Sequence, residues 1–339
     1  MSISLIVPVY NRPEEVDELL ASCVEQTDPD FQIIIVEDGS KRDCRAVCDR
    51  YADRLRIKYF AKENSGPGLT RNYGFERSTG SYGVFLDSDV LLPEHYIEAV
   101  KRETAKHRYD VFGGPDRAHS SFSPLQKAIN YAMTSFFTTG GIRGGTETHD
   151  SADGRTKAKN FHPRSFNMGI TREVFEKTGG FGAMRFGEDI DLSIRIREAG
   201  FNSGLIRGAY VYHKRRTSFR QFFKQVHNSG IARIDLHLLH PGTLKVVHTL
   251  PAVFVVGVVV SLLLALFWSP AWLIPLGVWA GAIFIDAILE EGSLYVAGLA
   301  VAASVVQLVG YGTGSLGAAW RRLVRGEGAR GAFLDSFYE

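Results

Sequence analysis

The chain has 339 residues, a net charge of +2 and three cysteines, enough length for about two domains. Three cysteines exclude a disulfide scaffold, and we interpret Cys44 and Cys48 as free thiols because no second pair of metal ligands accompanies them. The small net charge does not indicate nucleic acid as a partner, and we expect none.

The first 245 residues alternate patterns of buried strands with patterns of helices. Strands are predicted at 3–9, 32–36, 57–60 and 82–86, with helices at 14–24 and 41–51. Such alternation predicts an α/β fold with a mostly parallel, doubly wound sheet.

Polar residues follow three of these strands, and ligands of α/β sheets bind at the carboxyl ends of strands. They are Tyr10, Asn11 and Arg12, then Glu37 and Asp38, then Asp87 and Asp89. Two carboxylates one residue apart suit Mg²⁺ or Mn²⁺. A turn capped by Asp and Ser explains the same Asp-Ser-Asp pattern, so both interpretations stay open.

A second acidic group opens the helix predicted over 188–199. Glu188, Asp189 and Asp191 lie in its first turn, where the helix dipole stabilises acids whatever their role. A structural role and a catalytic role are therefore both compatible with the pattern.

Five segments in order carry a resemblance: IVPVYNRP, IIVEDGS, SGPGLTRNYG, VFLDSDV and GEDIDL. Together they resemble the family 2 glycosyltransferases, inverting enzymes with a GT-A fold, a Rossmann-like fold that binds nucleotide-diphospho-sugars. The resemblance covers roughly residues 3–215, the predicted catalytic domain, and the tail that follows resembles that of membrane-anchored bacterial members. It implies a nucleotide-diphospho-sugar donor, UDP more than GDP, and a divalent cation, Mg²⁺ or Mn²⁺.

The resemblance also assigns roles to residues around the donor. Asp38 matches the residue that contacts the base, and Pro8, Tyr10 and Glu37 line the same pocket. Arg71 matches an arginine near the diphosphate, although an arginine on a solvated helix face would give the same pattern. Asp87 and Asp89 match the metal-binding pair, Asp87 also lying near the nucleotide, and His213 matches a histidine that can join them as a ligand.

The remaining roles concern the reaction and the acceptor. Asp189 matches the general base, which takes the proton of the acceptor hydroxyl. Asn167, Met168 and Gly169, together with Glu188, match the acceptor region. The glycine-rich segment 140–159 is predicted to be a loop, either a lid over the donor or a tolerated insertion.

The segment 216–245 is predicted to be an amphipathic helix in the plane of lipid head groups, with a helix packed on the catalytic domain as the alternative. Seven Lys or Arg and one acid lie between Lys214 and Lys245. By the positive-inside rule they mark the cytoplasmic side, and the N-terminus shows no signal peptide. We therefore expect a catalytic domain in the cytoplasm at the inner (plasma) membrane, with membrane lipids as partners.

The forty residues from Val246 to Ile285 contain no Lys, Arg, Asp or Glu. We predict a membrane domain over 246–320, with apolar helices at about 248–268, 271–289 and 294–319, and a short basic tail over 321–339. Three full crossings would place the basic tail outside, against the positive-inside rule. Either the third stretch is therefore re-entrant or interfacial, or the second stretch does not cross.

The combined prediction is a membrane-anchored transferase that moves a sugar to a lipid-linked or glycan acceptor in the synthesis of cell-surface polysaccharide. Two alternatives remain open. One is a polyprenyl-phosphate glycosyl synthase, whose acceptor is the lipid phosphate itself. The other is a non-catalytic GT-A scaffold, against which the intact Asp38, Asp87, Asp89 and Asp189 argue.

Overall fold

The computed structural model describes residues 2–117, 122–140, 162–184 and 186–327. These residues form two compact units. The first contains residues 2–117 and 162–213, and the second contains 122–140 and 214–327. The second unit resumes at Lys214, next to the predicted boundary at 215, but it also includes 122–140, which the prediction assigned to the catalytic domain.

A seven-stranded sheet forms the centre of the first unit, in the order β3-β2-β1-β4-β8-β6-β9. Its strands are β1 (Ile3–Val9), β2 (Phe31–Asp38), β3 (Ile57–Lys62), β4 (Tyr82–Leu86), β6 (Val111–Gly113), β8 (Asn167–Thr171) and β9 (Ser203–Leu205). The four predicted strands are confirmed and run parallel to one another. The short strand β8 runs antiparallel to β4 and β6, so the sheet is mixed.

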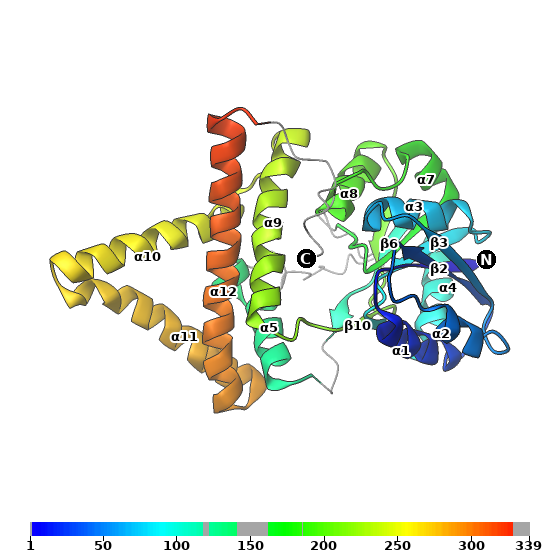
Figure 1. Cartoon of the computed structure of the whole chain (residues 1–339), viewed down its shortest axis with the longest axis horizontal. Helices are drawn as coiled ribbons and strands as arrows, with labels where there is room; N and C mark the ends of the chain where they lie inside the picture. Colours follow the sequence, from blue (N-terminus) through cyan, green and yellow to red (C-terminus); the bar gives the residue numbers. More distant parts are fainter. Residues whose placement is uncertain (1, 118–121, 141–161, 185, 328–339) are drawn as a thin grey trace. The chain divides into compact units, whose positions relative to one another are not determined.

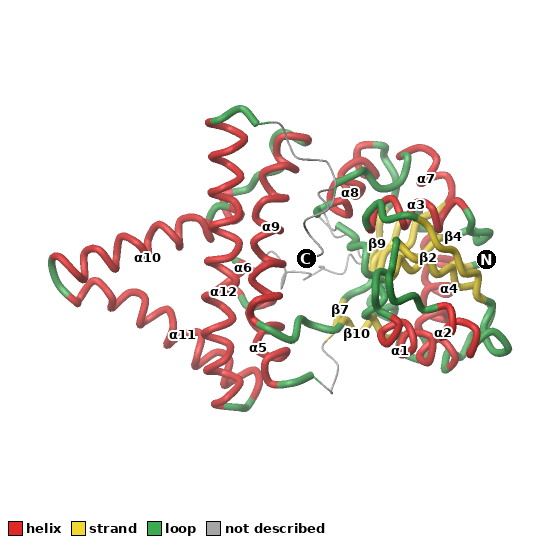
Figure 2. The backbone as a smooth tube through the Cα atoms, in the orientation of Figure 1, coloured by secondary structure: helices red, strands yellow, loops and turns green. Residues whose placement is uncertain are grey.

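Helices cover both faces of this sheet, as Figure 2 shows for its yellow strands. They are α1 (Pro13–Val24), α2 (Arg45–Arg50), α3 (Pro67–Glu76), α4 (Tyr96–His107), α7 (Arg172–Thr178) and α8 (Glu188–Glu198). Because successive side chains of a strand point to opposite faces, Leu5 joins one core cluster with α1, α2 and α4. Its neighbour Ile6 joins the other cluster, with α3, α7 and α8. Burial on both faces explains the continuous apolar run of β1.

A second, three-stranded sheet lies in the same unit. It consists of β5 (Val90–Leu91), β10 (Val211–His213) and β7 (Asp116–Arg117), in the order β5-β10-β7. Strand β5 begins directly after Asp89, so this sheet brings residues near 211 to the end of β4.

Helices make up the second unit (Figure 1). They are α5 (Pro124–Thr134), α6 (Phe136–Thr139), α9 (Phe219–Leu239), α10 (Leu250–Phe267), α11 (Ile274–Glu291) and α12 (Leu294–Ala319). Helix α9 runs unbroken through Gly230, which the sequence left as a possible break. The last three helices are each long and apolar enough to cross a membrane, which confirms the predicted apolar helices.

Glycines let α9 and α12 pack with their backbones in contact. A Cβ on Gly230 would lie 2.2 Å from the Tyr311 carbonyl oxygen, and one on Gly314 would lie 2.1 Å from the His227 carbonyl oxygen. Farther along, Arg322 Nε donates to Asp235 Oδ1 at 2.9 Å. The two helices are therefore parallel neighbours held by close packing and a buried ion pair.

This packing predicts opposite effects for two glycine substitutions in α12. Gly314→Ala places a methyl group on a backbone carbonyl and should cost about 1–3 kcal/mol through overpacking. Gly317→Ala meets no atom within 4 Å and should be neutral or stabilising by up to about 1 kcal/mol, because alanine favours helix. Thermal unfolding in detergent compares the two variants, and an equal change in melting temperature would contradict the close packing.

Candidate functional site

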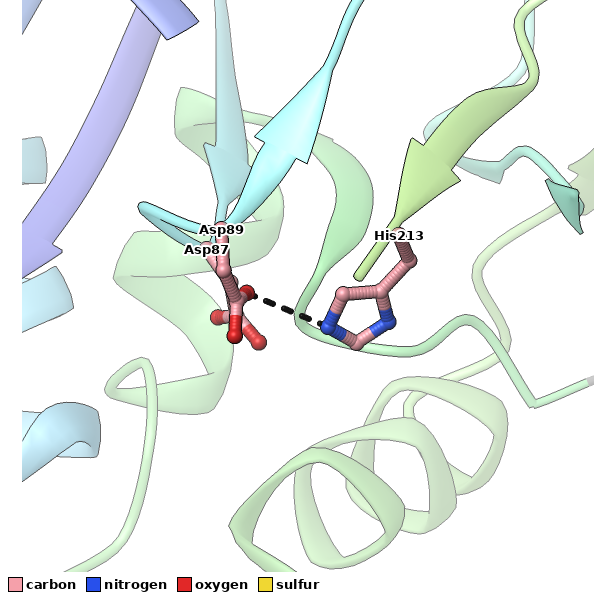
Figure 3. Close-up of side chains that lie close together, drawn as sticks. All are labelled: Asp87, Asp89 and His213. Carbon is pink, nitrogen blue, oxygen red and sulfur yellow. Dashed lines mark ion pairs between the residues drawn. The ribbon is translucent and has the colours of Figure 1, made fainter. Parts of the chain in front are cut away.

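Asp87, Asp89 and His213 form a cluster at the carboxyl end of β4 (Figure 3). One ligand atom from each residue lies within 4.8 Å of the ligand atoms of the others. His213 Nε2 lies 3.2 Å from Asp89 Oδ1. The structure thus brings together the three residues that the sequence assigned to metal binding.

Strand pairing explains why a residue 124 positions away joins the two aspartates. In the antiparallel pair of β5 and β10, His213 lies opposite Val90, the residue after Asp89. The ring of Phe166 stacks on the His213 ring with centroids 5.0 Å apart, which fixes the orientation of the imidazole. The histidine position therefore follows from the register of the small sheet.

The donor set fits a hard divalent cation. Two carboxylates supply oxygen ligands, which Mg²⁺ and Mn²⁺ prefer, and an imidazole is acceptable to Mn²⁺. Asp89 is buried and Asp87 and His213 are half-buried, so water is partly excluded from the cluster. These residues can hold the cation that the sequence predicts.

Arg12 is a member of the site that the sequence analysis did not assign. Its Nη1 donates to Asp89 Oδ2 at 2.7 Å, and its side chain is 34% exposed. The sequence already placed Arg12 after a predicted strand. Because β1 and β4 are parallel neighbours, their carboxyl ends bring Arg12 close to Asp89. A guanidinium thus neutralises part of the charge of the metal-ligating cluster.

Arg71 is buried and bridges two carboxylates. Its Nη2 donates to Asp87 Oδ1 at 2.7 Å and its Nη1 donates to Glu188 Oε1 at 2.9 Å. The bridge joins α3, the end of β4 and the first turn of α8. The alternative of an arginine on a solvated helix face is wrong, because only 4% of the Arg71 side chain is exposed.

Asp189, the predicted base, lies next to this bridge at the start of α8. Its Oδ2 lies 2.9 Å from Arg164 Nε, and its Oδ1 accepts a hydrogen bond from the Ile190 backbone N–H. Asp191, two residues on, pairs with Arg195 of the same helix. Two acids of one turn therefore have different partners, and only Asp189 adjoins the Arg71 bridge through Glu188.

Asp38 is buried and organises the loop that leads into α3. Its two oxygens accept hydrogen bonds from the backbone N–H groups of Ser65 and Gly66, each at 2.9 Å. Lys62, which lies opposite Asp38 in the pairing of β2 with β3, donates to the same carboxylate. Asp38 thereby fixes the turn at Gly66, whose φ of 89° suits glycine, just before the helix that carries Arg71.

Glu37 supports the backbone beside the predicted nucleotide pocket. Its Oε1 accepts from the Cys44 backbone N–H at 2.7 Å, and Ser40 donates to its other oxygen. Pro8 and Tyr10 are half-buried at the end of β1. The structure thus gives Glu37 a structural task, while base recognition by Pro8, Tyr10, Glu37 and Asp38 stays a prediction.

Asn167 and its neighbours lie in the core. The Asn167 amide accepts from the Tyr96 hydroxyl at 2.6 Å and donates to the Ala209 carbonyl at 2.7 Å. Met168 is fully buried, and Phe112 covers Gly169. These residues can influence an acceptor only through the position of β8, so Glu188 is the member of the predicted acceptor region that adjoins the site.

Most of the predicted loop 140–159 lies outside the described residues.

Comparison with known proteins identifies the family. The profile described as "Glycosyl transferase family 2" matches residues 4–179, about half of the chain. The chain belongs to glycosyl transferase family 2. The match confirms the predicted family and enzyme class, but it ends before Glu188, Asp189 and His213, whose roles stay predictions.

Several curated relatives are glycosyltransferases by name. RC0461 of Rickettsia conorii is 44% identical over 129 residues, 38% of this chain and 20% of that protein. EpsJ of Bacillus subtilis is 26% identical over 227 residues, 65% of this chain and 63% of that protein. This family 2 chain therefore spans less than two thirds of the length of the relatives it matches.

A solved structure supports the fold. The mannosyltransferase PcManGT of Pyrobaculum calidifontis, in complex with GDP-Man and Mn²⁺, is 17% identical with a TM-score of 0.53. The alignment covers 96% of this chain and 88% of that one. The likeness confirms the predicted GT-A fold of this family 2 member.

Burial makes Glu188 a pH-sensitive group. Desolvation and the neighbouring Asp189 raise the pKa of Glu188 from 4.5 to about 7, against the opposite effect of Arg71. The folded protein then binds a proton that the unfolded chain has released, so the free energy of unfolding should fall between pH 4.5 and 7 by at most roughly 3 kcal/mol. Glu188→Gln should remove this part of the pH dependence, measured as melting temperature against pH. The exposed Glu63→Gln is the control, and an unchanged slope in Glu188→Gln would contradict the assignment.

Arg12 should weaken the binding of free cation, because its guanidinium pairs with the Asp89 carboxylate and repels the cation. Arg12→Gln should bind Mn²⁺ about fivefold more tightly without nucleotide, equivalent to about 1 kcal/mol of repulsion removed. Asp89→Asn should abolish binding. Free Mn²⁺ measured by electron paramagnetic resonance gives the affinities, with Arg42→Gln, a substitution in an exposed pair with Glu14, as the control. Equal affinity in Arg12→Gln and the wild type would show that Arg12 does not compete.

Proposed function

We propose that this protein is an inverting glycosyltransferase that moves a sugar from a nucleotide-diphospho-sugar to a lipid-linked glycan acceptor. Two neighbouring sets of contacts carry the proposal. His213 pairs with Asp89, and a ligand atom of Asp87 lies within 4.8 Å of both. Arg71 then joins Asp87 to Glu188, in the turn that bears Asp189. These contacts lie at the carboxyl edge of the sheet, where ligands of α/β folds bind.

The residues divide between donor and acceptor. Asp38 holds the loop before α3, and the buried Arg71 directs its guanidinium toward the cluster of Asp87 and Asp89, where a diphosphate would bind. A divalent cation held by Asp87, Asp89 and His213 would stabilise the negative charge on the leaving diphosphate. The Mn²⁺ and GDP-Man bound by PcManGT, which shares the fold, support this class of ligands.

Asp189 is the base in this proposal. Inversion requires the acceptor hydroxyl to attack the anomeric carbon from the face opposite the nucleotide, and one carboxylate accepts the hydroxyl proton. Arg164 and the start of α8 hold the Asp189 carboxylate in one orientation. Glu188 pairs with the buried Arg71, whereas Asp189 pairs with Arg164, whose side chain is 40% exposed, so we assign proton transfer to Asp189.

The apolar helices of the second unit motivate the acceptor. Three helices that are able to cross a membrane, together with the basic segment between Lys214 and Lys245, favour an enzyme at the cytoplasmic face of the plasma membrane. An acceptor attached to a lipid would be concentrated there.

The proposal predicts a separation of binding from turnover. Asp189→Asn should lower kcat by about 10²–10⁴-fold while donor affinity stays unchanged, because the base contacts the acceptor side. Asp89→Asn should lose donor binding as well. Asp191→Asn, in the same turn but paired with Arg195, is the matched control and should keep most of the activity.

The measurement uses detergent-solubilised protein with a panel of UDP-, GDP- and dTDP-sugars and Mn²⁺. Release of nucleotide gives turnover, and calorimetry gives donor affinity. One preferred donor, lost with chelator and with Asp89→Asn, is the expected result. Absence of binding by every donor would favour the scaffold alternative, and full activity of Asp189→Asn would favour a lipid-phosphate acceptor, which needs little base assistance.

A further inference from the structure

The three apolar helices differ in how much of each the protein itself covers. In the most apolar 18-residue stretch of each, the protein buries 0% of the residues in α10, 11% in the α11 region and 39% in the α12 region. Residues around α10 are exposed, including Val253, Val256, Val259 and Leu263. Helices α10 and α11 therefore need an apolar environment from outside, whereas much of α12 already has one inside the unit.

Helix α12 is covered by two helices that carry polar residues. Its first half packs on α5 through Ala297, Ala300 and Ala303, in one cluster with Ala128 and Ala132. Its second half packs on α9, where Gly310 lies against Phe223 and Val226. Because the Gly230 and Gly314 contacts join the backbones, α9 and α12 enter a bilayer together or not at all.

Helix α9 cannot accompany α12 through a bilayer. Arg220, Gln221 and Lys224 lie on its exposed surface, so lipid would surround them. Lys224 directly follows Phe223, which contacts Gly310 near the middle of α12, so a crossing α12 would carry this ammonium group deep into hydrocarbon. A charged side chain facing lipid at that depth is strongly unfavourable.

The hairpin of α10 and α11, in contrast to α9, is suited to cross a bilayer. Each helix has 18 residues, which gives a length of about 27 Å, close to the hydrocarbon thickness of about 30 Å. Figure 1 shows both helices leaving the side of α12 and meeting at a turn away from it. Trp268 and Trp272 are exposed at this turn, in keeping with an aromatic belt at a membrane interface.

The start of α10 contacts α12, and the acidic residues of the hairpin lie at the end of α11. The first turn of α10 meets α12 where a Cβ on Gly312 would lie 2.3 Å from the Pro251 carbonyl oxygen. At the other end, Asp286 accepts from the Tyr131 hydroxyl of α5 at 2.7 Å, and Glu290 and Glu291 follow. No Lys, Arg, Asp or Glu lies between Val246 and Ile285.

We propose that only the α10–α11 hairpin enters the bilayer, while α12 lies along α9 at the membrane surface. Two crossings return the chain to its starting face, so Arg321, Arg322 and Arg325 stay with the basic residues of α9. This arrangement removes the conflict between three crossings and the positive-inside rule, and it places the buried Arg322–Asp235 pair outside the hydrocarbon. The inference rests on the membrane association in the proposed function, but not on its chemistry.

A pair of arginine substitutions tests the proposal in the full-length protein. Val259 of α10 is 52% exposed and Val305, in the middle of α12, is 40% exposed, so neither change disturbs internal packing. Val259→Arg should lower the fraction retained in membranes after an alkaline carbonate wash by several-fold, because the charge meets hydrocarbon. Val305→Arg should be retained like the wild type. Equal loss in both variants would overturn the proposal, as would release of the wild type as an oligomer, which would mean that second copies cover the hairpin.

Cysteine labelling gives an independent measurement. The native cysteines Cys23, Cys44 and Cys48 are buried, so single exposed cysteines can be followed. In sealed vesicles, a membrane-impermeant maleimide should modify Lys245→Cys and Arg325→Cys from the same face. Modification of the two from opposite faces would overturn the proposal, because an odd number of helices would then cross. Labelling does not require activity, so a failed activity assay with the expected labelling pattern would reject the proposed chemistry alone.

Discussion

The site depends on the buried guanidinium of Arg71. It is the one contact in the described site that joins the end of β4, helix α3 and the first turn of α8. Removal of one partner from a buried ion pair typically costs 3–5 kcal/mol, because a buried charge is left uncompensated. Glu188 would be that charge, which makes the position of Asp189 depend on a residue that does not itself carry a proton in the proposed reaction.

The polar ends of neighbouring strands were predictable because parallel strands bring their carboxyl ends to one edge. The apolar strand patterns and the family motifs therefore predicted that Asp38, Asp87 and Asp89 lie at one site. Arg12 was named as a strand-end residue but received no partner, and Lys62 was not named, since an ion pair across strands depends on register, which a single sequence does not give. The antiparallel β8 was missed because five residues with a central glycine carry a weak strand pattern.

Hydropathy predicted three apolar helices but could not tell lipid from protein as their environment. In α12, glycine and alanine raise the apolar content and also allow close contact with α5 and α9. A small residue is equally suited to a membrane helix and to a packed helix, so composition alone leaves the choice open. The choice depends on which helix packs against the α12 backbone. That helix is α9, which carries charged residues, and only the tertiary structure shows this packing.

Charge at the site gives a reason for the pairing pattern. Four carboxylates, Asp87, Asp89, Glu188 and Asp189, are paired with three guanidinium groups, Arg12, Arg71 and Arg164. If all seven groups are ionised, one negative charge remains on the set. A divalent cation would turn this excess into a positive one, matched to a diphosphate. Protonation of Glu188, whose pKa burial raises, would shift the balance the same way, so the buried bridge links protonation to the charge that the donor meets.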